Sequence, residues 1–293
     1  MGEAVKAAPF AYLRPDTLAE ALAALAEHGD DARVIAGGQS LGAMLNMRIV
    51  TPKVLIDINR LSDLSSIDLD DPSLVTGATV RQSDAMADER IRTHLPLLAQ
   101  ALPHVGHYQT RNRGTLGGSI AHADPSAEIP LSLATLYGEV ELQSKRGRRR
   151  IKAREFFQSA LATACAPDEL VTALFWPVRR ARHGQAFIEF AIREGDYAIV
   201  AVACVLDIDA DGAASAVRLG FGGCGEAPQI VEMSDVAKTR LDESAVQTIA
   251  RDAAGRIECR SDLLATAPYR RQLAAVLAGK AIVLAYAEGQ AHA

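Results

Sequence analysis

The chain has 293 residues, of which 49% are hydrophobic, so it is long enough to bury a substantial core and to divide into two domains. Its 36 acidic and 31 basic side chains give a net charge of −5 at pH 7, which offers no overall attraction to nucleic acid or to an anionic membrane. No uncharged apolar run approaches the roughly 18 to 20 residues that span a bilayer, and the first residues lack the pattern of a secretion signal. We therefore expect a cytoplasmic protein without a membrane span and without a nucleic-acid partner.

The N-terminal residues predict a first α/β unit that ends near Arg60. Thr17 and Glu20 form a capping-box pattern, which starts a helix that Gly29 ends. Short apolar runs at residues 34–36 and 54–58 predict two buried strands. A glycine pair, Gly37 and Gly38, follows the first of these strands, and a helical turn follows it at residues 43–48.

A second α/β unit is expected over residues 61–177. It contains a strand at residues 74–79, a helix at 95–102 with Pro96 in its first turn, and a glycine-rich segment at 111–125. A further helix runs from Ser126 to Gly138, with Asp124 and Ser126 as its capping residues. Alternating residues on either side of 145–148 predict a hairpin, and a last strand at 170–176 leads to a domain boundary at Pro177.

Residues 178–293 are expected to form a small α+β domain. Three strand-like runs at residues 187–190, 198–206 and 216–221 come first, with a turn at Asp211 and Gly212. Helical patterns at residues 243–254 and 268–285 follow the strands. Strands that are followed by helices favour an α+β arrangement over an alternating α/β one.

The two glycine segments carry the strongest chemical signal. The first reads Ile35-Ala36-Gly37-Gly38-Gln39-Ser40-Leu41, and the second reads Arg113-Gly114-Thr115-Leu116-Gly117-Gly118-Ser119-Ile120-Ala121-His122-Ala123-Asp124-Pro125. Glycines can take positive φ and leave backbone N–H groups uncovered, and such groups bind phosphate. We therefore expect the two segments to clamp one dinucleotide from two sides.

These two segments resemble those of the flavoprotein subunits of molybdenum hydroxylases. Two further stretches share the resemblance: residues 190–200, which include Arg193-Glu194-Gly195-Asp196-Tyr197-Ala198, and Ser261-Asp262 with Tyr269-Arg270-Arg271. That family includes the medium subunit of carbon monoxide dehydrogenase and the flavin domain of xanthine dehydrogenase. The resemblance covers about residues 10–284. It implies a two-subdomain FAD-binding fold of the p-cresol methylhydroxylase (PCMH) and vanillyl-alcohol oxidase type, over residues 1–60 and 61–177, followed by the small α+β domain.

The resemblance also implies where FAD is bound. In the first segment the contacts are Ile35, Ala36, Gly37, Gly38, Gln39, Ser40 and Leu41; in the second they are Thr115, Leu116, Gly117, Gly118, Ser119, His122 and Asp124; Glu128, Leu170 and Tyr197 complete the set. Tyr197 is expected to lie against the isoalloxazine ring, with Asp196 near its edge. Glu189 stands near a position that is lysine in some relatives. No catalytic side chain and no metal ligand is expected on this chain.

By the same resemblance, we expect the chain to be an electron-transfer subunit of a heterotrimer, within a dimer of heterotrimers. A large subunit would hold the molybdopterin cofactor, and a small subunit would hold two 2Fe-2S clusters that pass electrons to FAD and on to an external acceptor. Two alternatives stay open: a stand-alone FAD-dependent oxidoreductase, and a scaffold subunit without flavin.

Three other patterns are weaker. Gly220-Phe221-Gly222-Gly223-Cys224-Gly225 matches a dinucleotide fingerprint, but no helix pattern follows it directly, so we expect no Rossmann site there. His104 and His107 have no third ligand at a recognisable spacing. The four cysteines, which are far apart, argue against an iron–sulfur or zinc site within the chain.

Overall fold

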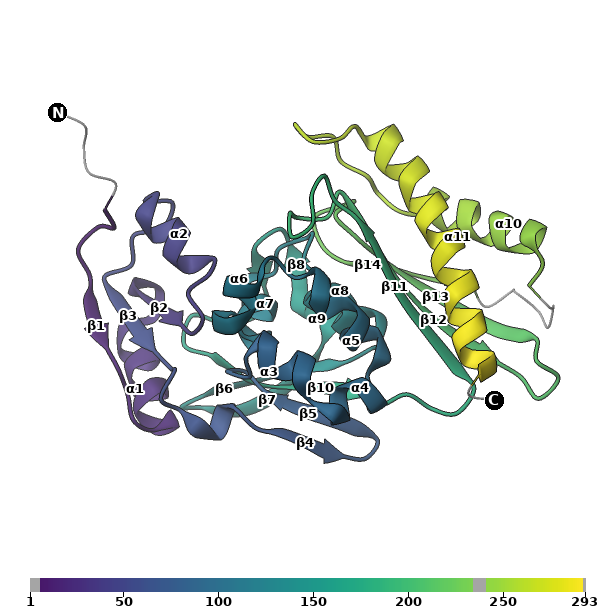
Figure 1. Ribbon diagram of the computed structural model, residues 1–293. Helices are drawn as coiled ribbons and strands as arrows, with labels where there is room; N and C mark the ends of the chain where they lie inside the picture. Colours follow the sequence, from purple (N-terminus) through teal and green to yellow (C-terminus); the bar gives the residue numbers. More distant parts are fainter. Residues whose placement is uncertain (1–5, 234–240, 292–293) are drawn as a thin grey trace.

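The computed structural model describes residues 6–233 and 241–291 and shows three bodies in a row (Figure 1). A small parallel sheet lies at one end, a five-stranded antiparallel sheet covered by helices lies in the middle, and a four-stranded sheet with two long helices lies at the other end. A two-stranded ribbon of β8 (Phe157–Ser159) and β9 (Ala162–Thr163) belongs to the middle body.

The first body is a three-stranded parallel sheet in the order β1-β3-β2. Its strands are β1 (Ala11–Leu13), β2 (Ala32–Ile35) and β3 (Val54–Asp57), and its helices are α1 (Leu18–His28), α2 (Leu41–Asn46) and the 3₁₀ turn η1 (Gly29–Asp31). The predicted capping box is confirmed, since the Glu20 N–H donates to Thr17 Oγ1 at 3.2 Å. α1 ends at Gly29, as expected, and buries its apolar face on the sheet.

The middle body is an antiparallel sheet in the order β4-β5-β10-β6-β7. Its strands are β4 (Ile67–Asp70), β5 (Ser73–Gly77), β6 (Glu139–Ser144), β7 (Gly147–Lys152) and β10 (Leu170–Pro177). Trp176 of β10 is fully buried, and its indole N–H donates to Thr76 Oγ1 at 3.0 Å. The predicted hairpin between β6 and β7 is confirmed.

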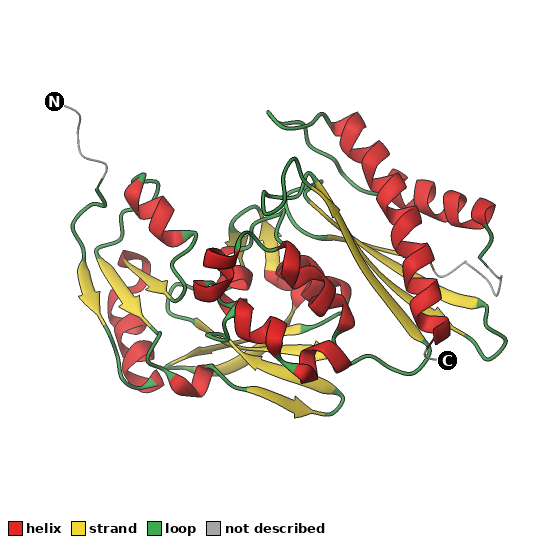
Figure 2. Ribbon diagram, in the orientation of Figure 1, coloured by secondary structure: helices red, strands yellow, loops and turns green. Residues whose placement is uncertain are grey.

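Short helices lie over this sheet (Figure 2). They are η2 (Ser62–Leu64), α3 (Gln82–Ala87), α4 (Glu89–His94), α5 (Pro96–Ala101), η3 (Leu102–His104), α6 (Tyr108–Arg113), α7 (Leu116–His122), α8 (Glu128–Thr135) and α9 (Ala153–Phe156). Pro96 stands at the first position of α5, as predicted. The predicted caps of the next helix are wrong: α8 begins at Glu128 after Ala127, and Asp124 instead accepts from the Ser126 N–H in a turn before the helix.

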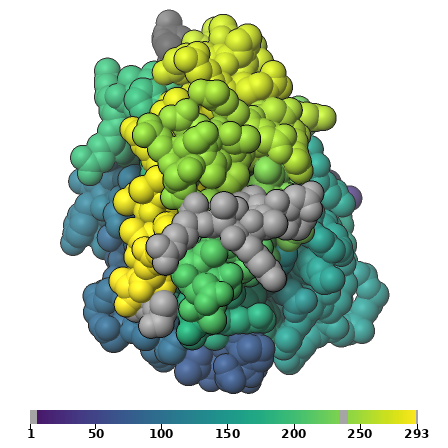
Figure 3. All heavy atoms as spheres, turned by 90° about the vertical axis from the view of Figure 1, so that its right-hand side faces the viewer, coloured from purple at the N-terminus to yellow at the C-terminus, as the bar shows by residue number. Residues whose placement is uncertain are grey.

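The third body is an antiparallel sheet in chain order, formed by β11 (His183–Phe190), β12 (Val200–Ile208), β13 (Ala214–Gly222) and β14 (Gln229–Met233). The predicted helices are α10 (Glu243–Gly255) and α11 (Ala267–Ala291), and both cover one face of the sheet (Figure 1). They form part of the outer surface at this end of the molecule (Figure 3). The expectation of strands followed by helices is confirmed, while β14 is an addition to the predicted elements.

In the described part of the chain, one helix, α11, is long and apolar enough by length and composition to cross a membrane. It packs along β11, where Gly184 allows a very close approach, because a Cβ atom there would overlap the carbonyl oxygen of Ala285. Leu277, Ala281 and Ile282 are buried against the sheet. One side of α11 is therefore packed against the sheet of the third body.

Candidate functional site

A cavity of about 750 Å³ lies where the three bodies meet. Its volume falls in the range of small-molecule sites. The first glycine segment, the second glycine segment, the start of β10 and the loop that carries Tyr197 all contribute to its wall. Sixteen of the 17 residues expected to contact FAD line it; the exception is Leu116, which is fully buried in the core of the middle body.

The first glycine segment leaves a row of backbone donors free. No acceptor within the described residues takes the N–H groups of residues 37–41. Gly38 has φ of +68°, which turns the chain, and the Gln39 side chain fixes the turn by donating to the Gly37 carbonyl at 3.0 Å. A concave run of free N–H groups is the arrangement that holds phosphate oxygens.

The second glycine segment differs from the expectation, because most of it is helical. Thr115 caps α7 by accepting from the Gly118 N–H at 3.0 Å, and the Gly117 N–H donates to Ala78 at 3.0 Å. Neither glycine has positive φ, so the expected set of uncovered N–H groups is found in the first segment only. In the second segment the glycines serve close packing: a Cβ atom on Gly117 would lie 2.6 Å from the Ala78 backbone.

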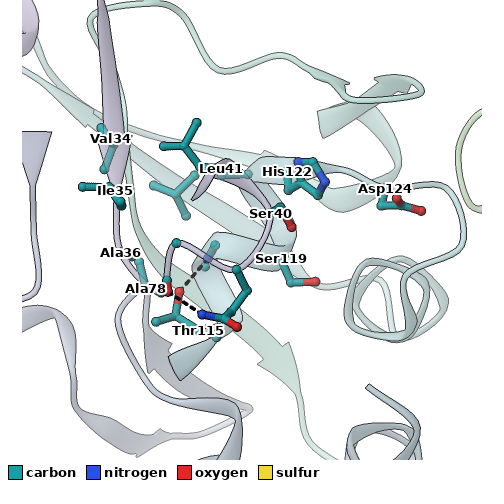
Figure 4. A pocket seen from close by; sticks show the side chains of 18 of the residues that line it. Val34, Ile35, Ala36, Ser40, Leu41, Ala78, Thr115, Ser119, His122 and Asp124 are labelled. Carbon is teal, nitrogen blue, oxygen red and sulfur yellow. Dashed lines mark hydrogen bonds between the residues drawn. The ribbon is translucent and has the colours of Figure 1, made fainter. Parts of the chain in front are cut away.

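A polar latch joins the two segments. Arg81 donates to the carbonyl of Arg113 and, at 2.6 Å, to Asn59 Oδ1, and Asn59 donates in turn to the carbonyl of Ala36 at 2.9 Å. Burial lowers the pKa of Arg81 from its usual value. Gly37 makes the contact possible, since a Cβ atom there would overlap the Arg113 carbonyl oxygen. Ser40 and Ser119 then point toward one space from the two segments (Figure 4).

Glu128 is the most unusual titratable group of the cavity wall. It is 6% exposed, and burial raises its pKa to about 8, so the carboxyl group is largely protonated at neutral pH and can donate a hydrogen bond. Burial also lowers the pKa of His122, which keeps that imidazole neutral. Asp124 lies between them in sequence and lines the same cavity.

Tyr197 lies on the far wall, in the loop between β11 and β12. Tyr197 is 59% exposed, and its hydroxyl makes no hydrogen bond to another described residue. Gly195, with φ of +83°, seats this loop on His107, where a Cβ atom would overlap the imidazole. A flat amphipathic side chain in this position is able to stack on a planar ligand.

Several wall residues were not predicted. Gln82, Thr110, Cys165 and Glu169 line the cavity and lie outside the quoted motifs, although Glu169 adjoins the predicted Leu170. Burial raises the pKa of Cys165 to about 12, so it stays a thiol. That the loop before β10 lines the cavity could have been inferred from Leu170. When the first residue of a strand contacts a ligand, the loop that precedes it lies near that ligand too.

The glycine run at residues 220–225 and the pair His104 and His107 do not line the cavity. Gly220 and Gly222 belong to the antiparallel strand β13, and Gly223 turns the chain toward β14 rather than into a helix, which confirms the absence of a Rossmann motif. His104 pairs with Glu189, with 3.4 Å between Nδ1 and Oε1, and this contact raises the pKa of His104. Within residues 6–233 and 241–291, no three His, Cys, Asp or Glu side chains could hold a metal ion together.

A run of free N–H groups and an exposed aromatic ring on the wall of one cavity suit a ligand that carries phosphate groups and a planar ring. Comparison with known families is more specific. Residues 8–179 match the FAD binding domain in molybdopterin dehydrogenase, and residues 185–285 match the C-terminal domain of the carbon monoxide dehydrogenase flavoprotein.

Individual relatives agree with these matches. The chain is 40% identical to the alpha subunit of the 6-hydroxypseudooxynicotine dehydrogenase complex of Paenarthrobacter nicotinovorans over 75% of each chain, and 33% identical to caffeine dehydrogenase subunit beta of Pseudomonas sp. (strain CBB1) over 96% of each. The solved carbon monoxide dehydrogenase of Hydrogenophaga pseudoflava, in a form that lacks the Mo-pyranopterin moiety, superposes with a TM-score of 0.92 at 30% identity, covering 96% of this chain and 99% of that one.

The chain therefore belongs to the family of FAD-binding medium subunits of molybdenum hydroxylases. It is an oxidoreductase subunit, and its N-terminal part is an FAD-binding domain. The predicted family, fold class and cofactor are confirmed.

Proposed function

We propose that FAD lies along the cavity with its pyrophosphate on the first glycine segment and its ring beside Tyr197. The free N–H groups of residues 37–41 are the observation that carries this orientation, because they are the unpaired donors suited to phosphate oxygens. Ser40 and Ser119 add hydroxyl donors from the two sides of the latch, and Ile35, Ala36, Leu41 and Leu170 add apolar wall.

The residues of the middle body then bind the rest of the cofactor. Protonated Glu128 donates a hydrogen bond to an oxygen or nitrogen atom of the ribose, the adenine or the ribityl chain of FAD. Asp124 accepts a hydrogen bond from a hydroxyl group of FAD. Thr115 and Gly117 act indirectly, because they hold α7 against β5, while Gly118 and His122 face the cofactor. Leu116 supports this arrangement from the core and makes no contact of its own. In this proposal residues 1–60, 61–177 and 178–293 are the three structural units.

We propose further that the chain works in a heterotrimer with a large molybdopterin subunit and a small subunit that carries 2Fe-2S clusters, in the cytoplasm. Bound FAD supplies reversible electron acceptance and donation. The side chains of this subunit bind and orient it and exclude water; we assign none in the described part of the chain as a nucleophile or general base. Relatives that are named as subunits of dehydrogenase complexes support this assignment.

The first test is the cofactor content of the purified chain. We expect about one FAD per chain, from the visible spectrum and from mass analysis of the released ligand, without molybdopterin or iron. If the chain binds no flavin even after FAD and its co-purifying partners are added, the proposal is overturned and a scaffold subunit without flavin is favoured. Turnover of a substrate by the isolated flavin-loaded chain would favour a stand-alone oxidoreductase.

A pair of glycine variants tests the orientation. Gly37→Ala places a Cβ atom into the Arg113 carbonyl and forces the two segments apart, whereas Gly42→Ala, directly after the first segment in α2, meets no atom within 4 Å. We expect Gly37→Ala to weaken FAD binding by at least about tenfold, which corresponds to roughly 1.4 kcal/mol. Gly42→Ala should bind FAD like the unaltered chain. Equal affinity of both variants would contradict the role of the first segment.

A further inference from the structure

Arg270, near the start of α11, is the least exposed charged residue in the described part of the chain, at 2%. Burying a cation is costly unless its donors are paired. Its guanidinium donates to Asp262 Oδ2 at 2.5 Å, to the carbonyl of Gly223 at 2.8 Å and to the carbonyl of Ile199. This pairing holds the pKa of Asp262 at about 2, below its usual value.

Both carbonyl acceptors lead to the FAD cavity. Ile199 follows Tyr197 by two residues, and its own N–H donates to Phe190 at 2.8 Å, which closes the loop that carries Tyr197. Gly223 donates its N–H to the carbonyl of Pro125 at 2.8 Å, and Pro125 directly follows Asp124. One guanidinium in the third body is thus connected to two walls of the cavity.

Gly223 allows the two carbonyls to converge. Its φ is +75°, and a Cβ atom would lie 2.7 Å from the Ile199 oxygen and 2.9 Å from the Ala198 oxygen. The exposed side chain of Tyr197, by contrast, has no hydrogen bond to another described residue. The position of the ring is therefore set by the backbone of its loop, and this backbone is fastened to Arg270.

We propose that Arg270, with its partner Asp262, is a positioning residue for the flavin ring: it fixes the Tyr197 loop relative to the segment of Asp124 and Glu128. The proposal rests on the function proposed above, in which Tyr197 lies beside the ring. Arg270 does not line the cavity, so its effect on the flavin must pass through the segments that it holds, and we assign that effect to the Tyr197 loop. The first glycine segment, which holds the pyrophosphate, is independent of it.

The test compares Arg270→Gln with Arg271→Gln in the FAD-loaded full chain. Arg271 is the neighbouring exposed arginine, and it donates to the Ile257 carbonyl at 3.2 Å, away from the cavity. We expect Arg270→Gln to keep FAD with a dissociation constant within about tenfold of the unaltered chain. Its flavin should show reduced fluorescence quenching and a shifted visible circular dichroism spectrum and midpoint potential. Arg270→Lys should restore part of each shift, and Arg271→Gln should shift none.

Tyr197→Ala separates positioning from a general structural effect. If Arg270 acts through the tyrosine, Arg270→Gln should change the flavin spectrum and potential much less in the Tyr197→Ala background than in the unaltered chain. Equal shifts in both backgrounds would overturn the proposal, as would an unchanged flavin in Arg270→Gln.

If Arg270→Gln does not fold, Asp262→Asn serves instead, because it removes only the ion pair and leaves both carbonyl acceptors. Asp262→Asn should shift the flavin fluorescence and circular dichroism in the same direction as Arg270→Gln, but by a smaller amount. An unchanged flavin spectrum would contradict the proposal. If the unaltered chain binds no FAD, the proposed function itself is contradicted. This outcome differs from an unchanged flavin in the variants, which contradicts only the positioning role of Arg270.

Discussion

A single buried carboxyl group, Glu128, gives the cavity its own pH dependence. Its pKa is raised from 4.5 to about 8, first by burial and then by the neighbouring charges of Glu189 and Asp124, while His104 lowers it. An acid that is protonated more readily when folded stabilises the fold fully below its unfolded pKa, and this stability is lost as pH rises from about 4.5 to about 8. The full effect is on the order of 3–5 kcal/mol.

We therefore predict that the free energy of unfolding of the FAD-free chain falls between pH 5 and pH 8, and that Glu128→Gln removes most of this fall. Urea denaturation at several pH values measures it. Glu155→Gln, a change at an exposed glutamate of α9, is the control and should keep the slope of the unaltered chain. A Glu128→Gln variant with that same slope would show that Glu128 is ionised in the folded state.

At the scale of single residues, the sequence identified Glu128 by its place after a motif and Tyr197 by its family context. It did not indicate that Glu128 is buried, because the shielding comes from elements far away in the chain. Gln82 was missed for the same reason: it has no neighbour in sequence that signals a ligand, and only the folding of the middle body brings it to the cavity. Thr110 directly precedes the glycine-rich segment at residues 111–125, but it lies outside the motif that the sequence offered.

At the scale of elements, α7 shows tertiary packing overriding a local preference. Two adjacent glycines disfavour a helix by roughly 1 kcal/mol each relative to alanine, and the sequence indicated a loop. The helix forms because Thr115 caps it and because Leu116 and Ile120 are buried in the core. The capping box of α1 and Pro96 of α5 were predictable, since those signals are local.

The glycines of α7 are therefore needed for space. Gly117→Ala would place a Cβ atom 2.6 Å from the Ala78 backbone, and we predict that it lowers the free energy of unfolding by about 1–3 kcal/mol through overpacking. Gly279→Ala in α11 is the matched control, because its nearest neighbours would be at 3.8 Å and ordinary helix propensity should make it neutral or stabilising by up to about 1 kcal/mol. Denaturation midpoints that move alike in both variants would contradict this packing role.

At the scale of the whole molecule, the order of the three bodies could be predicted, but their convergence could not. The latch from Arg81 to Asn59 and Arg113 joins residues 22 and 32 positions apart, and Arg270 reaches 71 positions back to Ile199. Such contacts follow from how the bodies pack, and a chain pattern does not encode them locally. The expectation that the three bodies share one FAD site came from the family resemblance and not from hydrophobic periodicity.

Because the cavity wall comes from all three bodies, FAD should stabilise them together. Binding to the folded state alone at a free concentration 100 times the dissociation constant adds about 2.7 kcal/mol to the free energy of unfolding. We predict that FAD then slows amide hydrogen exchange both in residues 36–41 and in residues 193–197, which lie in different bodies, and that Gly37→Ala reduces both effects at the same total FAD concentration. Protection of residues 36–41 without protection of residues 193–197 would mean that the cofactor ends before Tyr197, and the wall formed by the third body would then serve another purpose.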